Sequence, residues 1–429
     1  MGIVIAVTVL LGLYMAWNIG ANDAANSMAD AVGSGALSIK HAIILAALCE
    51  LAGSVLVGSH VADTVRKGIV DPAAFQAAEL ALGMMCALLA AGLWLNLATW
   101  LGMPVSTTHS IVGAVAGFGL IGAGWGAVHW ATMGEIVGSW FISPVAGCLL
   151  AFILFKLVAG TILGSFRPAR AASRVMPFLV FFIAAVVTLA TVFKGMKNVQ
   201  GSSSWLVGKG PFLMASVVGV VSALMSALLL RRRLAPYERA PIPQQLEQVE
   251  RAFAPLVIIT SCCIAFAHGA NDVANAVGPL AAVVDIVRSG TVKMRVGVPA
   301  WILALGGAGI VLGVSTFGYR VIKTVGTKLT QLTPSRGVVA DTSATTVVLV
   351  CTLMGWPIST THVLVGAIMG VGLARGLGAV NRRVTVNIFS SWLVTVPAAA
   401  LLAVVLFLVS RALLLPAMQA ILEQAAAAR

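Results

Sequence analysis

The sequence predicts an all-α protein that crosses a membrane many times, judging from its hydropathy, the pattern of its apolar segments and an internal duplication. Of 429 residues, 59% are hydrophobic and only 10% are charged, and the mean hydropathy is +1.01. Soluble proteins, in contrast, carry about 25% charged residues. Since a membrane-crossing helix needs about 20 apolar residues, the chain has room for on the order of 12 membrane segments.

The apolar segments are long and rich in Ala, Leu, Val and Gly, and they do not alternate with polar residues. Because the strands of an outer-membrane barrel do alternate, this pattern favours helices. The net charge of +13 comes from Lys and Arg in short segments between apolar runs. This distribution is typical of topology signals and not of a nucleic-acid-binding surface. We therefore expect a multi-pass protein of the cell (inner) membrane, surrounded by lipid and without a nucleic-acid partner.

Two motifs occur once in each half of the chain, so the sequence predicts two structural repeats. The first motif, Gly-Ala-Asn-Asp-x-Ala-Asn, occupies residues 20–26 and 269–275, and the second, Pro-x-Ser-Thr-Thr-His, occupies residues 104–109 and 357–362. The copies are 249 residues apart for the first motif and 253 for the second, which chance does not explain. We expect a first repeat at 1–164, connecting helices and a cytoplasmic polar linker at 165–254, a second repeat at 255–415 and a tail at 416–429.

The first motif predicts a cation site. Asp23 and Asp272 lie beside apolar helix, where a charged side chain costs about 2.5–3.5 kcal/mol and is functional by default, although helix capping is the alternative. The neighbouring asparagines lie on the same helix face, and a helix break near Gly20 or Gly269 would free backbone carbonyls. Such a cluster of oxygens suits a hard cation such as sodium. The predicted sodium ligands are Asn22, Asp23, Asn26, Asn271, Asp272 and Asn275.

The second motif predicts an oxyanion site. Pro104 and Pro357 cannot continue a helix, and the hydroxyl residues after them favour the N-cap of the next helix. The N-terminus of that helix directs free N–H groups and partial positive charge at an anion. Broken helices at matching places in two repeats indicate a transporter site, where the four segments converge. The predicted anion-binding residues are Ser106, Thr107, Thr108, Ser359, Thr360, Thr361, Asn26 and Asn275.

Two further features have structural interpretations. Each hydroxyl motif is followed by a Gly-x-x-x-Gly pair, at 113 and 117 and at 366 and 370. This spacing lets helices approach closely, so we expect a packing face. His268 precedes the second Asn-Asp motif only, and we expect it to pack or to form hydrogen bonds.

The charges of the two sites predict cotransport. A divalent oxyanion and two carboxylates would bring about four negative charges into a medium of low dielectric constant, which is prohibitive without cations. Sodium ions, or protons on the carboxylates, would largely offset this charge.

Both motifs, with the residues that continue the first copy as far as Gly35, resemble the PiT family of inorganic phosphate transporters over nearly the whole chain except the linker and the tail. The resemblance implies two inverted helical repeats with broken helices and re-entrant hairpins, a homodimer, and secondary transport of inorganic phosphate by alternating access. Residues 31–35 and 66–68 look like the sodium-coupled branch, so sodium ions are the expected co-transported ions. At the positions of Glu50 and Asp341, members of that branch carry acids relevant to transport. Asp341 is shorter than the Glu that it resembles, and a packing or capping role is equally open.

Three alternatives remain. A proton-coupled phosphate or sulfate symporter would have the same fold. Phosphate is favoured over sulfate because monohydrogen phosphate can donate a proton to Asp23 or Asp272. An ion channel would lack tight occlusion of the substrate. An enzyme that used Ser106 or Ser359 with a following histidine is disfavoured, because adjacent positions on one chain do not aim a histidine at a serine as a base. We therefore do not expect this chain to be an enzyme.

Overall fold

Helices form all of the regular structure in the described chain. The computed structural model describes residues 1–58, 68–101, 103, 105–196, 209–292, 298–319, 322, 332–353, 358–376, 378 and 380–427. Within these ranges the β contacts amount to one isolated bridge, between Val70 and Val128. The all-α prediction is confirmed.

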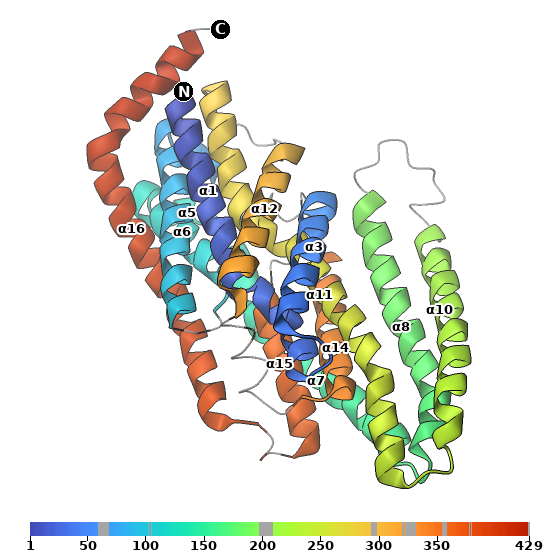
Figure 1. Ribbon diagram of the computed structural model, residues 1–429. Helices are drawn as coiled ribbons and strands as arrows, with labels where there is room; N and C mark the ends of the chain where they lie inside the picture. Colours follow the sequence, from blue (N-terminus) through green and yellow to red (C-terminus); the bar gives the residue numbers. More distant parts are fainter. Residues whose placement is uncertain are drawn as a thin grey trace.

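The described residues contain twelve α-helices of 16 or more residues. Eight of them lie in spans that are long and apolar enough to cross a membrane. These are α1 (Gly2–Asn22), α3 (Ile39–Val57), α5 (Ala77–Trp100), α7 (Trp130–Val158), α8 (Pro168–Met196), α10 (Gly210–Leu234), α11 (Ile242–Ser289) and α16 (Arg382–Ala427). The other four are α6 (Thr107–Ala123), α12 (Ala300–Thr316), α14 (Pro334–Leu353) and α15 (Thr360–Arg375). Figure 1 shows α1 beginning and α16 ending at the same end of the molecule.

The Gly-x-x-x-Gly pairs join helices of one half to helices of the other. In α15, a Cβ atom at Gly370 would lie 2.1 Å from the carbonyl oxygen of Cys148 in α7. In α6, a Cβ atom at Gly117 would lie 2.6 Å from the carbonyl oxygen of Ala400 in α16. The glycines one turn earlier in α6 and α15 make equally close contacts. The packing role expected for these glycines is confirmed, and the contacts cross between the halves.

The two Asn-Asp motifs differ in their backbone. Helix α1 ends at Asn22, and a 3-10 turn, η1 (Ala24–Met28), leads into the short helix α2 (Ala29–Gly33). Helix α11, in contrast, continues without interruption through residues 269–275. The break expected near Gly20 therefore lies at Asp23, and the break expected near Gly269 is wrong. Because a continuous helix pairs its own carbonyl groups, the second motif offers only side chains to a ligand.

The hydroxyl motifs begin helices as expected. Ser106 is the N-cap of α6, where its Oγ atom accepts a hydrogen bond from the backbone N–H of His109 at 3.1 Å. Ser359 caps α15 in the same way, with the N–H of His362 at 3.2 Å. The predicted N-caps are confirmed. Pro104 and Pro357, expected to end the preceding helices, lie outside the described residues.

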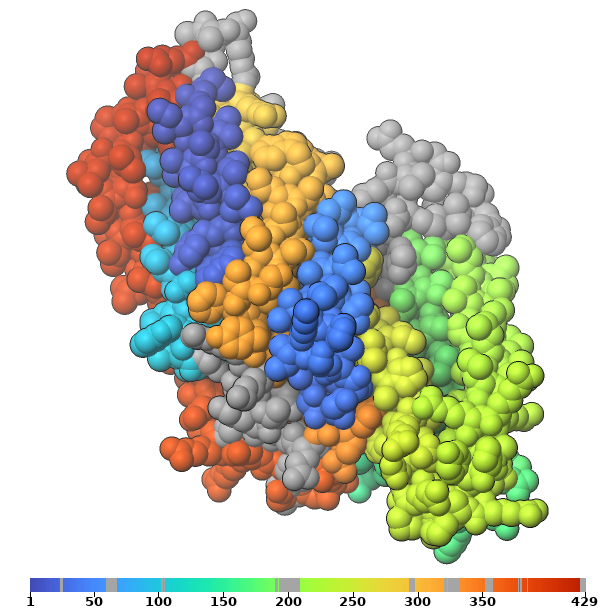
Figure 2. All heavy atoms as spheres, viewed as in Figure 1, coloured from blue at the N-terminus to red at the C-terminus, as the bar shows by residue number. Residues whose placement is uncertain are grey.

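Helices α8 and α10 pack against each other at one side of the molecule (Figures 1 and 2). The polar segment 231–254 that follows is largely helical, comprising the end of α10, the 3-10 turn η5 (Ala235–Tyr237) and the start of α11. Val249 and Phe253 in this segment are fully buried. The polar stretch is thus packed against the remainder of the protein on one face.

The close helix contacts predict a destabilising effect of Gly370→Ala. The new Cβ would overlap the Cys148 carbonyl oxygen, and overpacking of this kind costs about 1–3 kcal/mol. Thermal unfolding of the purified protein in detergent measures the effect. Gly138→Ala in α7 is the control, because nothing lies within 4 Å of a Cβ at Gly138. Equal unfolding temperatures for the two variants would contradict the packing.

Candidate functional site

Both Asn-Asp motifs and both Ser-Thr-Thr motifs meet in the interior of the protein. Asn26 Nδ2 donates a hydrogen bond to Thr361 Oγ1 at 3.0 Å. Asn275 Nδ2 donates to Thr108 Oγ1 at 3.1 Å and to Thr107 Oγ1 at 3.3 Å. All five side chains are buried. The Asn-Asp motif of each half thus contacts the hydroxyl motif of the other half, and the four segments converge as expected from the sequence.

Asp23 connects the hydroxyl motifs of both halves. Its Oδ2 atom accepts a hydrogen bond from the backbone N–H of Thr107 at 3.1 Å, and its Oδ1 atom accepts one from the hydroxyl group of Thr361. The Thr107 N–H is one of the unpaired amides at the N-terminus of α6, where the helix dipole favours negative charge. Asp23 therefore occupies part of the region in which an anion would be stabilised.

Asp272 makes the corresponding contacts in the second half. Its Oδ2 atom accepts a hydrogen bond from Thr360 Oγ1 at 2.9 Å, at the start of α15. Its Oδ1 atom accepts one from Asn271 Nδ2 at 2.7 Å. The two acids thus lie at the beginnings of the two hydroxyl helices.

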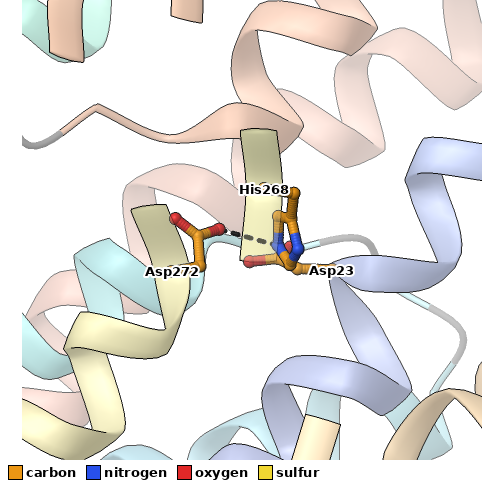
Figure 3. A group of neighbouring side chains, drawn as sticks. All are labelled: Asp23, His268 and Asp272. Atoms are coloured by element: carbon orange, nitrogen blue, oxygen red, sulfur yellow. Dashed lines mark ion pairs between the residues drawn. The ribbon is translucent and has the colours of Figure 1, made fainter. Parts of the chain in front are cut away.

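His268 lies close to Asp23 and Asp272 (Figure 3), and its contact with Glu50 extends the site to α3. Its Nε2 atom is 2.7 Å from Asp272 Oδ2, and its Nδ1 atom is 2.8 Å from Glu50 Oε2. Ligand atoms of Asp23, His268 and Asp272 all lie within 4.8 Å of one another. His268 thus lies within ion-pair distance of two carboxylates, those of Glu50 and Asp272.

The hydrogen-bonding role expected for His268 is confirmed, but its position at the centre of the site was not predicted. The sequence does contain a signal for its contact with Asp272, because residues four apart lie on the same helix face. Its contact with Glu50 joins residues 218 positions apart. Only the packing of α11 against α3 brings these two side chains together.

The two halves are not equivalent at this point. A Cβ atom at Gly269 would meet the backbone of Glu50, and one at Gly20 would meet the backbone of Ile310 in α12. Ile310 thus occupies the same position relative to Gly20 that Glu50 occupies relative to Gly269. Ile19, which lies 249 residues before His268, is the residue equivalent to that histidine. Of these two equivalent positions between the halves, one holds the ionisable Glu50–His268 pair and the other holds two isoleucines. His268, which lies close to both Asp23 and Asp272, therefore has no ionisable counterpart at the equivalent position.

Asn22 and Asn271 hold the loops before the hydroxyl motifs. Asn22 Oδ1 accepts a hydrogen bond from the N–H of Val105 at 3.1 Å, and its Nδ2 atom donates to the carbonyl group of Met103 at 3.0 Å. Asn271 Nδ2 donates to the carbonyl group of Ile358 at 3.3 Å. These two predicted ligands thus brace Ser106 and Ser359 in position.

Glu50 and Asp341, the two acids suggested by the resemblance to the transporter family, lie in different parts of the structure. Glu50 reaches the site through His268, whereas Asp341 contacts an earlier part of α11. Asp341 Oδ2 accepts hydrogen bonds from Ser261 Oγ at 2.6 Å and from Thr260 Oγ1 at 3.0 Å.

The space at the site is small. A cavity of about 10 Å³ lies beside Asp23, Asn26, His268, Thr360 and Thr361, which is room for about one water molecule. A larger cavity of about 770 Å³ lies between α6, α7, α15 and α16, but apolar side chains form most of its walls and neither Asn-Asp motif reaches it. An anion larger than water must therefore replace hydrogen bonds between the two halves. Among the described residues, no Lys or Arg takes part in the contacts given above.

Comparisons with known proteins agree with this arrangement. The family model described as the phosphate transporter family matches residues 19–403. A protein named as a phosphate permease in Pyrococcus abyssi is 46% identical over 404 residues, covering 93% of this chain and 96% of its own length. The chloroplastic inorganic phosphate transporter 2-1 of Arabidopsis thaliana is 40% identical, covering 93% of this chain and 70% of its own length. A solved structure titled the sodium-dependent phosphate transporter has a TM-score of 0.88 and 41% identity, covering 96% of this chain and 99% of its own.

The contacts of His268 predict energetic coupling with Glu50. His268→Ala would remove the donor to the buried Glu50 carboxylate and the ion-pair contact of Asp272, and breaking a buried pair in this way costs about 3–5 kcal/mol. In a Glu50→Gln background the same change should cost less, because fewer charges remain unpaired. Chemical unfolding of the four proteins, in buffer without sodium or phosphate, measures the coupling. Additive effects would contradict a direct Glu50–His268 contact.

Proposed function

The chain belongs to the phosphate transporter family, and from this membership we propose that it imports inorganic phosphate by sodium symport. Eight spans suited to crossing a membrane make it a multi-pass membrane protein. The family and the solved relative are transporters, so the chain is a transporter and not an enzyme. The observation that carries the proposal is the crossed contact of each Asn-Asp motif with the hydroxyl motif of the other half.

Phosphate is bound in this proposal by the beginnings of α6 and α15. The hydroxyl groups of Thr107, Thr108, Thr360 and Thr361 face the Asn-Asp motifs. They can turn to donate to phosphate oxygens once their present partners are released. The N-termini of the two helices add free N–H groups and partial positive charge. Ser106 and Ser359 start these helices, and Asn26 and Asn275 supply amide donors.

Sodium is bound in this proposal by the carboxylate groups of Asp23 and Asp272, with amide oxygens of the neighbouring asparagines. Hard oxygen ligands suit a hard monovalent cation. The charge argument is independent of the ligand list. A phosphate dianion beside two carboxylates is strongly repelled in the protein interior, and co-bound sodium ions remove that repulsion. The solved relative is titled a sodium-dependent phosphate transporter, which supports the same ion.

Alternating access follows in this proposal from the crossed contacts. The hydrogen bonds of Asn26 and Asp23 with Thr361, and of Asn275 with Thr107 and Thr108, join an Asn-Asp motif of one half to a helix start of the other. Relative movement of these segments would break the bonds and open the site. The proposed assembly is a homodimer of chains with inverted repeats in the cell (inner) membrane. A proton-coupled phosphate or sulfate symporter is the alternative. Sulfate lacks the proton that monohydrogen phosphate can donate to Asp23 or Asp272, which favours phosphate.

Sodium-driven uptake provides a test of the carboxylate role. Asp23→Asn should reduce radiolabelled phosphate uptake into proteoliposomes to the level of empty vesicles, because the carboxylate that attracts the cation is gone. Asp71→Asn, which changes a loop aspartate far along the chain from both motifs, should leave uptake unchanged. Uptake driven equally well by sodium, potassium or proton gradients would contradict sodium symport.

The hydroxyl helices provide a test of the anion site. Thr361→Ala should raise the apparent KM for phosphate about tenfold, because a lost hydrogen bond of about 1.4 kcal/mol corresponds to that factor. Thr161→Ala is the matched control, since the Thr161 hydroxyl group only donates to its own helix. Uptake measured against increasing phosphate, with sulfate as a competitor, gives both KM and selectivity. An unchanged KM in Thr361→Ala would remove α15 from the phosphate site.

A further inference from the structure

A second pair of buried acids lies apart from the site, with Asp30 in α2 and Asp341 in α14. Both side chains are fully buried, and the two carboxyl groups interact electrostatically. Neither belongs to the group formed by Asp23, His268 and Asp272. Helix packing fixes the contact, because a Cβ atom at Gly337, one turn before Asp341, would lie only 3.3 Å from the Cβ of Asp30. The backbone therefore places Asp30 against α14, one turn from Asp341.

The two acids differ in the donors available to them. Asp341 Oδ2 accepts hydrogen bonds from Ser261 and Thr260. Asp341 Oδ1 and both oxygens of Asp30 have no hydrogen-bond partner in the described part of the chain. The titratable groups that face Asp341 from α11 are the thiols of Cys262 and Cys263, which carry no positive charge. No ion pair formed by described residues, from α3, α7, α8, α15 or elsewhere, includes either acid.

A single proton between the two carboxyl groups removes their repulsion and provides the hydrogen-bond donor that they lack. Two ionised carboxylates offer acceptors only, so they cannot hydrogen-bond to each other, and in the protein interior they repel strongly. If Asp30 is protonated, its O–H donates to Asp341 Oδ1. Asp341 then accepts three hydrogen bonds as a carboxylate, and Asp30 is neutral. We propose that Asp30 and Asp341 form a proton-binding site, in which Asp30 carries the proton and Asp341 accepts its hydrogen bond.

This proton site is connected to the candidate transport site by the backbone. Helix α2 directly follows η1, the turn that carries Asn26, so the Asp30–Asp341 hydrogen bond ties that turn to α14. Loss of the proton makes the contact repulsive and favours separation of α2 from α14. A cavity of about 10 Å³, which is room for about one water molecule, lies beside Thr260, a donor to Asp341, and beside Thr342 and Thr345.

Infrared difference spectroscopy tests the proton directly. Spectra are recorded for the purified full-length wild type and Asp30→Asn in potassium buffer without sodium or phosphate. At neutral pH, their difference spectrum should contain the carbonyl band of a protonated carboxylic acid. At higher pH, carboxylate bands should replace it. Asp341→Asn should shift the frequency of the same band, because the acceptor of the Asp30 O–H changes from a carboxylate to an amide oxygen. Since neither transported ion is present, the result does not depend on the proposed symport.

Glu247→Gln is the matched control, because the Glu247 side chain is 57% exposed and pairs with Arg251 at the surface. Its difference spectrum should show carboxylate bands at neutral pH. Carboxylate bands in place of the protonated band for Asp30→Asn would overturn the proposal. So would a difference spectrum that changes on addition of sodium at constant pH, since this would identify a sodium site instead. If Asp30→Asn fails to fold, Asp341→Asn against wild type decides the same question.

Discussion

The cost of holding Asp23 and Asp272 in the interior governs the arrangement of the site. A carboxylate away from water is stable only with donors or positive charge close to it. The protein supplies threonine hydroxyl groups, the N-terminal amide of α6 and, for Asp272, the His268 side chain. The same donors suit a phosphate oxygen. Phosphate and the two carboxylates therefore compete for one set of donors unless cations hold the acids.

The contacts between halves explain why one binding event can affect the whole molecule. Asn26 reaches Thr361, and Asn275 reaches Thr108, so the site is complete only when the two halves meet. The glycine contacts of α6 and α15 join the same halves through close backbone packing. A ligand that replaces the hydrogen bonds of Asn26 and Asn275 leaves the glycine contacts between the helices intact. This separation allows the site to rearrange while the helices remain associated.

The sequence predicted the features that depend on local chemistry. The helix starts at Ser106 and Ser359 follow from N-cap preference, and the duplicated motifs indicated which segments meet. The break expected near Gly269 is absent because α11 packs as a continuous helix against α3, which local sequence does not reveal. The contacts of His268 with Glu50 and of Asp30 with Asp341 join residues far apart in the chain. Such pairs depend on tertiary packing, so no motif spacing could indicate them.

Phosphate binding to the wild-type protein, measured with and without sodium, tests the central claim most directly. If the buried acids repel phosphate until cations neutralise them, sodium should raise phosphate affinity by a large factor, and phosphate should raise sodium affinity by the same factor. Equilibrium binding of labelled phosphate and labelled sodium to the purified protein gives both numbers. Equal phosphate affinity in sodium and in potassium would contradict the claim.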